Sequence, residues 1–179
     1  GFSPEDKIII AVGLFLQRKG ILDFVELAKQ LPQYHFIWFG ECNLWTVPKA
    51  VREAVHTKLP NLHFPGYVPR EILRGAYSGS DLFLFPTYEE TEGIVLLEAL
   101  AMQIPVLVRD IPIYEQWLED GRDLYKGKTI EEMREKIIGI LEGHLPDLTQ
   151  AGYQVAKERD IAKIGQELKA QYERVLSMP

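Results

Sequence analysis

The sequence of 179 residues is poor in several features that would each direct its interpretation elsewhere. Its single cysteine, Cys42, excludes an internal disulfide framework and suits a reducing compartment. Its longest apolar stretch, residues 8–16, is too short to span a bilayer. The 20 basic residues are outnumbered by 26 acidic ones, so the net charge is −6. That balance argues against a nucleic-acid partner.

Several common catalytic and metal-binding motifs are also missing. The chain has no Gly-x-Ser-x-Gly elbow, which leaves a hydrolase triad unsupported. Its 4 histidines show no metal-ligand spacing and Cys42 has no CxxC partner, so we expect neither a metal nor a cofactor. The loop after the first apolar run is neither Gly-x-Gly-x-x-Gly nor a P-loop, which weakens the dinucleotide and NTPase interpretations.

The chain opens on Gly-Phe-Ser-Pro-Glu-Asp, with neither a start methionine nor a signal-peptide pattern. A chain of this length can bury about 70% of its extended surface, and one domain over residues 1–179 is the better expectation. The abrupt start indicates a piece of a longer protein.

Short apolar runs alternate with segments of helical periodicity. The runs are rich in β-branched and aromatic residues, as in strands buried on both faces of a parallel sheet. We predict strands at residues 8–12, 35–39, 62–64, 81–85 and 105–108. We predict helices over residues 21–31, 50–55, 69–76, 94–102, 112–121, 130–141 and 151–176, with 94–102 well inside the fold. The alternation predicts an α/β fold with a doubly wound, Rossmann-like parallel sheet.

In such a sheet, ligands bind beyond the carboxyl ends of the strands. The first loop there runs from Gly13, which allows a sharp turn, to Gly20, near the start of a helix. Arg18 and Lys19 lie between them and could neutralise a diphosphate together with helix N-terminal amides. Taken alone, this dipeptide is more simply explained as a solvated pair before a helix.

The loop after the fourth predicted strand carries Glu89, Glu90 and Glu92 just before an apolar helix. Glu98 lies inside that helix, where a charge is costly unless it is paired, so we expect a specific partner for it. A carboxylate can accept two hydrogen bonds from a vicinal diol. The alternative is that the loop carboxylates complement the helix dipole and that Glu98 pairs with a nearby cation.

The amides of Gly93, Ile94 and Val95 open the same helix and suit a phosphate. A carboxylate aimed at a phosphate would be repelled. The coherent division is therefore amides for phosphate and glutamates, Glu90 and Glu98, for sugar hydroxyls.

The pattern Glu90-x7-Glu98, followed by Ala99 and Pro105-Val106-Leu107, resembles the signature of retaining two-Rossmann-domain (GT-B) glycosyltransferases. The order of the other segments fits as well, from the Gly13 loop to the run ending at Pro86. The resemblance covers essentially the whole chain and implies the C-terminal, donor-binding half of a GT-B fold.

The resemblance implies a role for each matching position. Glu90 would contact the transferred sugar, and Glu98 would bind the nucleotide ribose. The diphosphate would meet Arg18 and Lys19, near Gly13. The remaining donor contacts would come from the amides of Gly93, Ile94 and Val95 for the phosphates and from Tyr67 and Val68 beside the base.

Two positions depart from the family pattern. The family usually has arginine directly after the first glycine, where this chain has Leu14, and Arg18 is the candidate replacement. Thr91 and Glu92 stand where Gly-Phe is more usual, so the loop beside the sugar is unusual.

Finer segments resemble bacterial diacylglycerol glucosyltransferases, among them Arg18-Lys19-Gly20, Phe36-Ile37-Trp38-Phe39-Gly40 and Val108-Arg109-Asp110-Ile111-Pro112. That resemblance implies a hexosyltransferase that moves glucose from UDP-glucose to diacylglycerol. It also implies an N-terminal acceptor domain outside this chain, and a cytoplasmic enzyme peripheral to the inner face of the plasma membrane. The isolated domain would bind nucleotide and transfer little or no sugar.

Other functions stay open from the residues alone. One alternative is a GT-B transferase with another nucleotide-sugar donor and a non-lipid acceptor, or a GT-B-like epimerase or phosphorylase. A further alternative is a non-enzymatic α/β interaction module such as a receiver-like domain. That class needs an acidic pocket after the first strand, where this chain has Gly13-Leu14.

Overall fold

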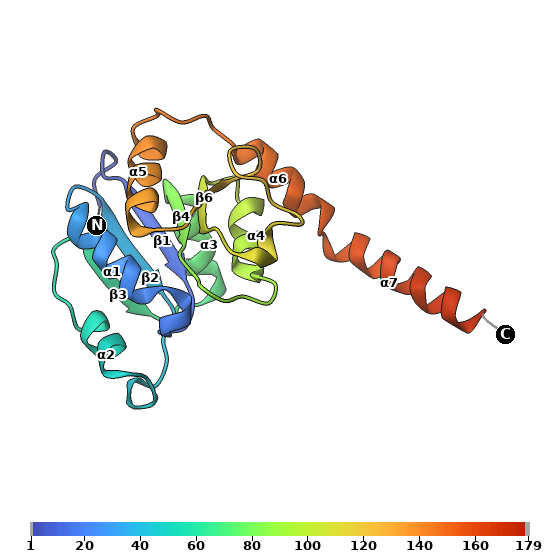
Figure 1. Ribbon diagram of the computed structural model, residues 1–179, viewed down its shortest axis with the longest axis horizontal. Helices are drawn as coiled ribbons and strands as arrows, with labels where there is room; N and C mark the ends of the chain where they lie inside the picture. Colours follow the sequence, from blue (N-terminus) through green and yellow to red (C-terminus); the bar gives the residue numbers. More distant parts are fainter. Residues whose placement is uncertain (1, 178–179) are drawn as a thin grey trace.

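The alternating apolar runs form one six-stranded parallel sheet between two layers of helices (Figure 1). The computed structural model describes residues 2–177. The strands are β1 (Ile8–Val12), β2 (His35–Phe39), β3 (Leu62–Gly66), β4 (Leu82–Phe85), β5 (Val106–Arg109) and β6 (Tyr125–Gly127). Their order across the sheet is β3-β2-β1-β4-β5-β6, the arrangement of a doubly wound Rossmann-like sheet, which confirms the predicted fold class.

Helices cover both faces of this sheet (Figure 1). The α-helices are α1 (Ile21–Gln30), α2 (Lys49–Val55), α3 (Arg70–Ser78), α4 (Ile94–Ala101), α5 (Ile130–Leu141), α6 (Thr149–Glu158) and α7 (Ile161–Leu176). Short 3-10 turns are η1 (Gln17–Lys19), η2 (Leu44–Thr46) and η3 (Pro112–Tyr114). Residues of α1, α2 and α5 share one apolar cluster with the sheet, and residues of α3, α4 and α6 pack in the other.

The central strands are buried on both sides, which explains their continuous apolar sequence. Ile9 and Ile10 are both fully buried, yet they belong to the clusters on opposite faces of the sheet. Full burial of such a side chain stabilises the fold by about 1.5–3 kcal/mol. β1 therefore packs against both helical layers at once.

Two strand predictions need correction. β3 continues through Pro65 and Gly66, beyond the strand predicted at residues 62–64. β6 was not predicted, because its three residues are too few for a periodic pattern and include Lys126. Lys126 is nevertheless buried within the strand, beside Asp110.

Two helix predictions are also wrong in extent. The helix predicted over residues 112–121 is only the 3-10 turn η3, followed by turns. The helix predicted over 151–176 divides into α6 and α7, because Asp160 caps a new helix by accepting a hydrogen bond from the amide of Ala162 at 2.8 Å. α7 has no buried residue and extends away from the sheet (Figure 1). Among residues 2–177, no helix has the length and hydropathy needed to cross a membrane.

The prediction that α4 lies well inside the fold holds for one of its faces only. Leu96, Ala99 and Leu100 are buried against the sheet. Ile94, at the start of the helix, is 63% exposed. The first turn of α4 thus opens to the surface just beyond the end of β4, and that is where a ligand can reach its amides.

The side chain of Asn61 ties the end of α1 to the start of β3. Its buried amide lies within hydrogen-bonding distance of the carbonyl oxygens of Ala28, Leu31 and Tyr34, at 2.9, 3.2 and 3.0 Å. The carbonyls of Ala28 and Leu31 lie at the end of α1, where a helix leaves carbonyls without intrahelical partners, and that of Tyr34 lies just before β2.

We expect Asn61→Ala to lower the free energy of unfolding by about 2–3 kcal/mol, because buried carbonyls lose their donor. Chemical denaturation measures the loss, with Gln33→Ala, an exposed amide in the same region, as the control. A loss no larger than that of Gln33→Ala would contradict this role.

Candidate functional site

The candidate site lies at the switch in strand order, between β1 and β4. To one side of β1 the sheet continues to β2 and β3, and beyond β4 it continues to β5 and β6. Loops that follow the carboxyl ends of strands at such a point diverge and leave a crevice for a ligand. Here these loops are residues 13–20 and residues 86–93.

The first of these loops is held by the neighbouring strand. The Gly13 amide donates to the carbonyl of Phe39 at 2.9 Å, and the Trp38 indole donates to the carbonyl of Gly13 at 2.8 Å. The left-handed backbone is at Gly20 (φ 79°) and not at Gly13, which corrects the sequence-based explanation for Gly13. A Cβ on Gly20 would lie 2.1 Å from the carbonyl oxygen of Pro86. The two loops therefore touch backbone to backbone, and only glycine fits.

This contact brings Lys19 and Glu90 together as an ion pair. Their side chains are only 15% and 9% exposed, and the Lys19 ammonium also lies 5.6 Å from the centre of the Phe85 ring. The sequence prediction gave these residues separate ligands, the diphosphate and the sugar, and did not foresee their pairing. A diphosphate entering here would offer Lys19 a second anion in place of Glu90.

Arg18 lies on a different side of the same loop. Its guanidinium donates to the carbonyl of Glu89 at 3.3 Å, and its own carbonyl accepts from the amide of Tyr88 at 2.7 Å. The side chain lines a separate surface hollow with Leu22 and Asp23. The structure thus brings Lys19, and not Arg18, to Glu90. The role of Arg18 in place of an arginine at Leu14 stays a prediction.

The N-terminus of α4 adjoins the ion pair. Gly93 adopts a left-handed conformation (φ 72°), and its carbonyl accepts from the amides of Leu96 and Leu97. Within residues 2–177, the amides of Gly93, Ile94 and Val95 have no hydrogen-bond acceptor. Amides of this kind, at the positive end of a helix dipole, suit an anion.

Glu98 lies one turn further along α4 and has the specific partners that its position predicts. Its carboxylate lies 3.4 Å from the Tyr77 hydroxyl and 3.8 Å from the guanidinium of Arg70, with its side chain 35% exposed. Burial, and then the charge of Glu98, raise the pKa of Tyr77 above its ordinary value. Glu98 has a cationic neighbour, Arg70, and is also accessible to a ligand. Both predicted roles, pairing with a cation and binding a diol, therefore remain open.

Tyr67 and Val68 follow β3 at the same edge of the sheet. Tyr67 is largely exposed, while Val68 packs against the apolar cluster that includes Phe39 and Tyr77. Their predicted place beside a base agrees with this position but is not tested by any contact.

Tyr114, in η3, is a residue that the sequence analysis missed. Its side chain is fully buried, and its hydroxyl has no hydrogen-bond partner among the described residues. The hydroxyl lies 3.5 Å from the position that a Cβ on Gly93 would occupy. Burial, and then the charge of Glu90, raise its pKa. No local sequence pattern identifies Tyr114, because only the folding of η3 against the start of α4 brings it near Gly93.

Arg109 is buried and pairs with Asp23 of α1, although Asp110 is its neighbour in the sequence. Asp110 instead faces Lys126 and Lys128, at 3.9 and 3.4 Å.

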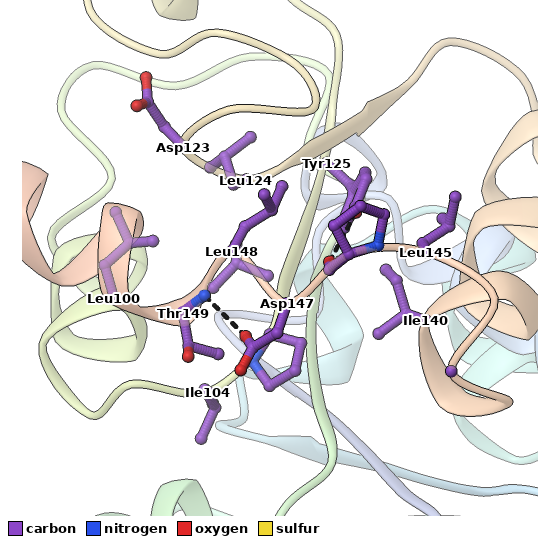
Figure 2. Close-up of a pocket in the computed structure, with 14 residues that line it drawn as sticks. Leu100, Ile104, Asp123, Leu124, Tyr125, Ile140, Leu145, Asp147, Leu148 and Thr149 are labelled. Atoms are coloured by element: carbon purple, nitrogen blue, oxygen red, sulfur yellow. Dashed lines mark hydrogen bonds between the residues drawn. The ribbon is translucent and has the colours of Figure 1, made fainter.

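A separate cavity of about 250 Å³ lies at the opposite edge of the sheet (Figure 2). Its wall includes Val106 and Tyr125, the first residues of β5 and β6, and is otherwise mainly apolar. The Tyr125 hydroxyl donates to the carbonyl of Pro146, and the Thr149 amide donates to Asp147 (Figure 2). None of the predicted site residues lines this cavity.

Comparison with known proteins shows the class of protein to which this domain belongs. Residues 1–158 match the sequence model of the family described as glycosyl transferases group 1. The chain belongs to this family. The resemblance stated from the sequence is thereby confirmed, and the enzyme interpretation is favoured over an interaction module.

Two curated relatives modify lipids by name. The processive diacylglycerol alpha-glucosyltransferase of Acholeplasma laidlawii is 41% identical over 176 residues, covering 98% of this chain and 53% of that protein. The alpha-galactosylglucosyldiacylglycerol synthase of Streptococcus pneumoniae is 33% identical, covering 88% of this chain and 43% of that protein. The chain thus spans about half the length of these relatives.

The fold is shared with solved glycosyltransferases. The sucrose-phosphate synthase of Thermosynechococcus elongatus superposes with a TM-score of 0.83 at 20% identity, over 98% of this chain and 47% of that one. This likeness confirms the predicted fold, a doubly wound, Rossmann-like parallel sheet.

We expect Tyr114→Phe to raise the free energy of unfolding by about 1 kcal/mol, because a buried hydroxyl without a partner costs free energy. Thermal and urea unfolding measure the change. Tyr77→Phe is the matched control and should destabilise, since the Tyr77 hydroxyl lies 3.3 Å from the carbonyl of Val95. Destabilisation of Tyr114→Phe by as much as Tyr77→Phe would contradict the assignment.

Proposed function

We propose that the chain is the donor-binding domain of a retaining glycosyltransferase that transfers glucose from UDP-glucose to diacylglycerol. The observation that carries the proposal is the Lys19–Glu90 ion pair beside the first amides of α4. Cation, amides and carboxylate lie at the switch in strand order, where a nucleotide sugar needs partners of both signs.

The donor's diphosphate is the natural ligand of the positive groups. Lys19 supplies a charge, and the amides of Gly93, Ile94 and Val95 supply hydrogen-bond donors backed by the dipole of α4. We propose that these protein groups, and not a metal ion, neutralise the diphosphate. Arg18 contributes only if its guanidinium leaves the carbonyl of Glu89.

The carboxylates take the hydroxyl groups of the donor. Glu98, about 6 Å further along the helix axis than Ile94, accepts from the ribose diol. Glu90 is released when Lys19 turns to the diphosphate, and it then accepts from hydroxyls of the transferred sugar. Tyr67 and Val68 flank the base.

Catalysis in this half consists of positioning the donor and stabilising the leaving group. As the bond to the sugar breaks, negative charge grows on the departing diphosphate. Lys19 and the α4 amides already face that charge, so little reorganisation is needed. Glu90 fixes the sugar against them.

The acceptor is proposed from the relatives. Both curated relatives named above carry a glycerolipid in their names and are about twice the length of the matched segment. We infer that an N-terminal acceptor domain, outside this chain, holds the lipid at a membrane surface. The intact enzyme would then be cytoplasmic and peripheral to the membrane.

We expect the chain to bind UDP, and Lys19→Ala and Glu98→Ala to weaken that binding at least about tenfold, or 1.4 kcal/mol each. Isothermal titration calorimetry gives the affinities. Lys49→Ala, an exposed lysine on α2, is the control and should bind as the unaltered chain does. Absence of binding at millimolar UDP, or unchanged binding by both site variants, would count against the function.

A further inference from the structure

Arg109 is the last residue of β5, and each of its three guanidinium nitrogens donates a hydrogen bond inside the protein. Its Nε donates to the carbonyl of Pro86 at 3.1 Å, and Nη1 donates to the carbonyl of Lys128 at 2.7 Å. Nη2 pairs with the carboxylate of Asp23. Because the side chain is buried and committed in this way, it cannot serve as a direct ligand of the donor.

Asp23 and Tyr88 complete this arrangement. The Tyr88 hydroxyl donates to the Asp23 carboxylate at 2.6 Å, and the Arg109 guanidinium lies 3.9 Å from the centre of the Tyr88 ring. Burial, and then the hydrogen bond to Asp23, raise the pKa of Tyr88. The end of β5, α1 and the loop after β4 are therefore locked together by three side chains.

The locked segment leads directly to Glu90. The carbonyl of Pro86 is held by Arg109, and the buried Thr87 hydroxyl lies 3.1 Å from the carbonyl of Arg18 and 2.9 Å from that of Glu89. The Tyr88 amide donates to the same Arg18 carbonyl. The residues held by these hydrogen bonds, Arg18 and residues 86–89, thus lie within four residues of Lys19 or Glu90 in the sequence.

The energetics of this ion pair indicate a role beyond stability. A buried ion pair adds little folding free energy over well-packed apolar residues, because both charges lose their hydration. It does fix geometry, since a guanidinium group bonded to a carboxylate and stacked on an aromatic ring can adopt few arrangements. Such geometry is what a site needs when its ligand-binding groups lie on loops.

We propose that Arg109, Asp23 and Tyr88 form a positioning unit, which fixes the loop after β4 so that Lys19 and Glu90 meet the diphosphate–sugar end of the donor. The inference rests on the proposed function. None of the three is a catalytic residue, since each acts through the loop.

The unit acts on one end of the donor only. Lys19 lies at the diphosphate, whereas Glu98 and Tyr67 lie toward the nucleoside. The gain in affinity from UMP to UDP, which reports the second phosphate, is therefore the quantity that the unit controls. A role in stability alone would lower the melting temperature and leave that gain unchanged.

The test compares UMP and UDP binding by the chain with that of Tyr88→Phe and Asp23→Asn, using calorimetry with thermal unfolding in parallel. Tyr88 is 49% exposed, so loss of its hydroxyl leaves a foldable chain. We expect the UMP-to-UDP gain to fall about 3- to 5-fold in Tyr88→Phe and about tenfold in Asp23→Asn, because the lysine is displaced from its phosphate.

Tyr34→Phe is the matched control. The Tyr34 hydroxyl also donates to a carboxylate, that of Glu142, at 2.6 Å, but it precedes β2 at the opposite edge of the sheet. This variant should lose stability and keep the full UMP-to-UDP gain.

The outcomes separate the two proposals. Failure of the unaltered chain to bind UDP refutes the proposed function itself. Binding by the unaltered chain, with an unchanged UMP-to-UDP gain in the folded variants, overturns the positioning unit alone. Failure of both variants to fold assigns the three residues to stability and also overturns it.

Discussion

The parallel pairing of β1 with β4 is the constraint on which the site depends. Ile9 pairs with Leu82 and Ile10 with Phe83, although about 70 residues separate the two strands in the sequence. Because the strands run the same way, the loops after them emerge at one edge. The loop after β1 leads to α1 on one face of the sheet, and the loop after β4 leads to α4 on the other. The two loops meet where the backbone of Gly20 contacts the carbonyl of Pro86. Any side chain at Gly20 would push Pro86 away and move the loop that carries Glu90 away from Lys19.

Two ion pairs lie within this contact and have opposite characters. Arg109 and Asp23 are buried, and each of the other two guanidinium nitrogens donates to a backbone carbonyl, so this pair is held within the fold. Lys19 and Glu90 are also largely buried, with side chains 15% and 9% exposed, but they adjoin the unpaired first amides of α4. The Arg109–Asp23 pair holds the loops, and we propose that the Lys19–Glu90 pair is the one that an anion exchanges. A site with fixed walls and one exchangeable contact binds without large rearrangement.

Much of this arrangement could be predicted from local sequence. The bounds of β1 and β2 follow from dense apolar runs, and α5 follows from its periodicity. Glu98 was expected to have a partner because it interrupts an apolar helix, and Tyr77 and Arg70 provide it.

Other features arise only from the fold. The partner of Arg109 lies 86 positions away, while Asp110 is its sequence neighbour. The Lys19–Glu90 pair likewise joins residues 71 positions apart. The sequence could therefore suggest a ligand for each residue but not that the two residues pair. β6 is too short to carry a pattern. The division of α6 from α7 depends on one capping aspartate, Asp160, which periodicity alone does not detect.

The central claim is that a diphosphate displaces Glu90 from Lys19. Affinities of UDP for Glu90→Gln, Lys19→Ala and the double variant test it most directly. Glu90→Gln removes the competing anion and keeps the side-chain shape, so the account predicts UDP binding equal to or tighter than that of the unaltered chain. It also predicts that this variant loses the added affinity for UDP-glucose over UDP. A Glu90→Gln chain that binds UDP as poorly as Lys19→Ala would contradict the account.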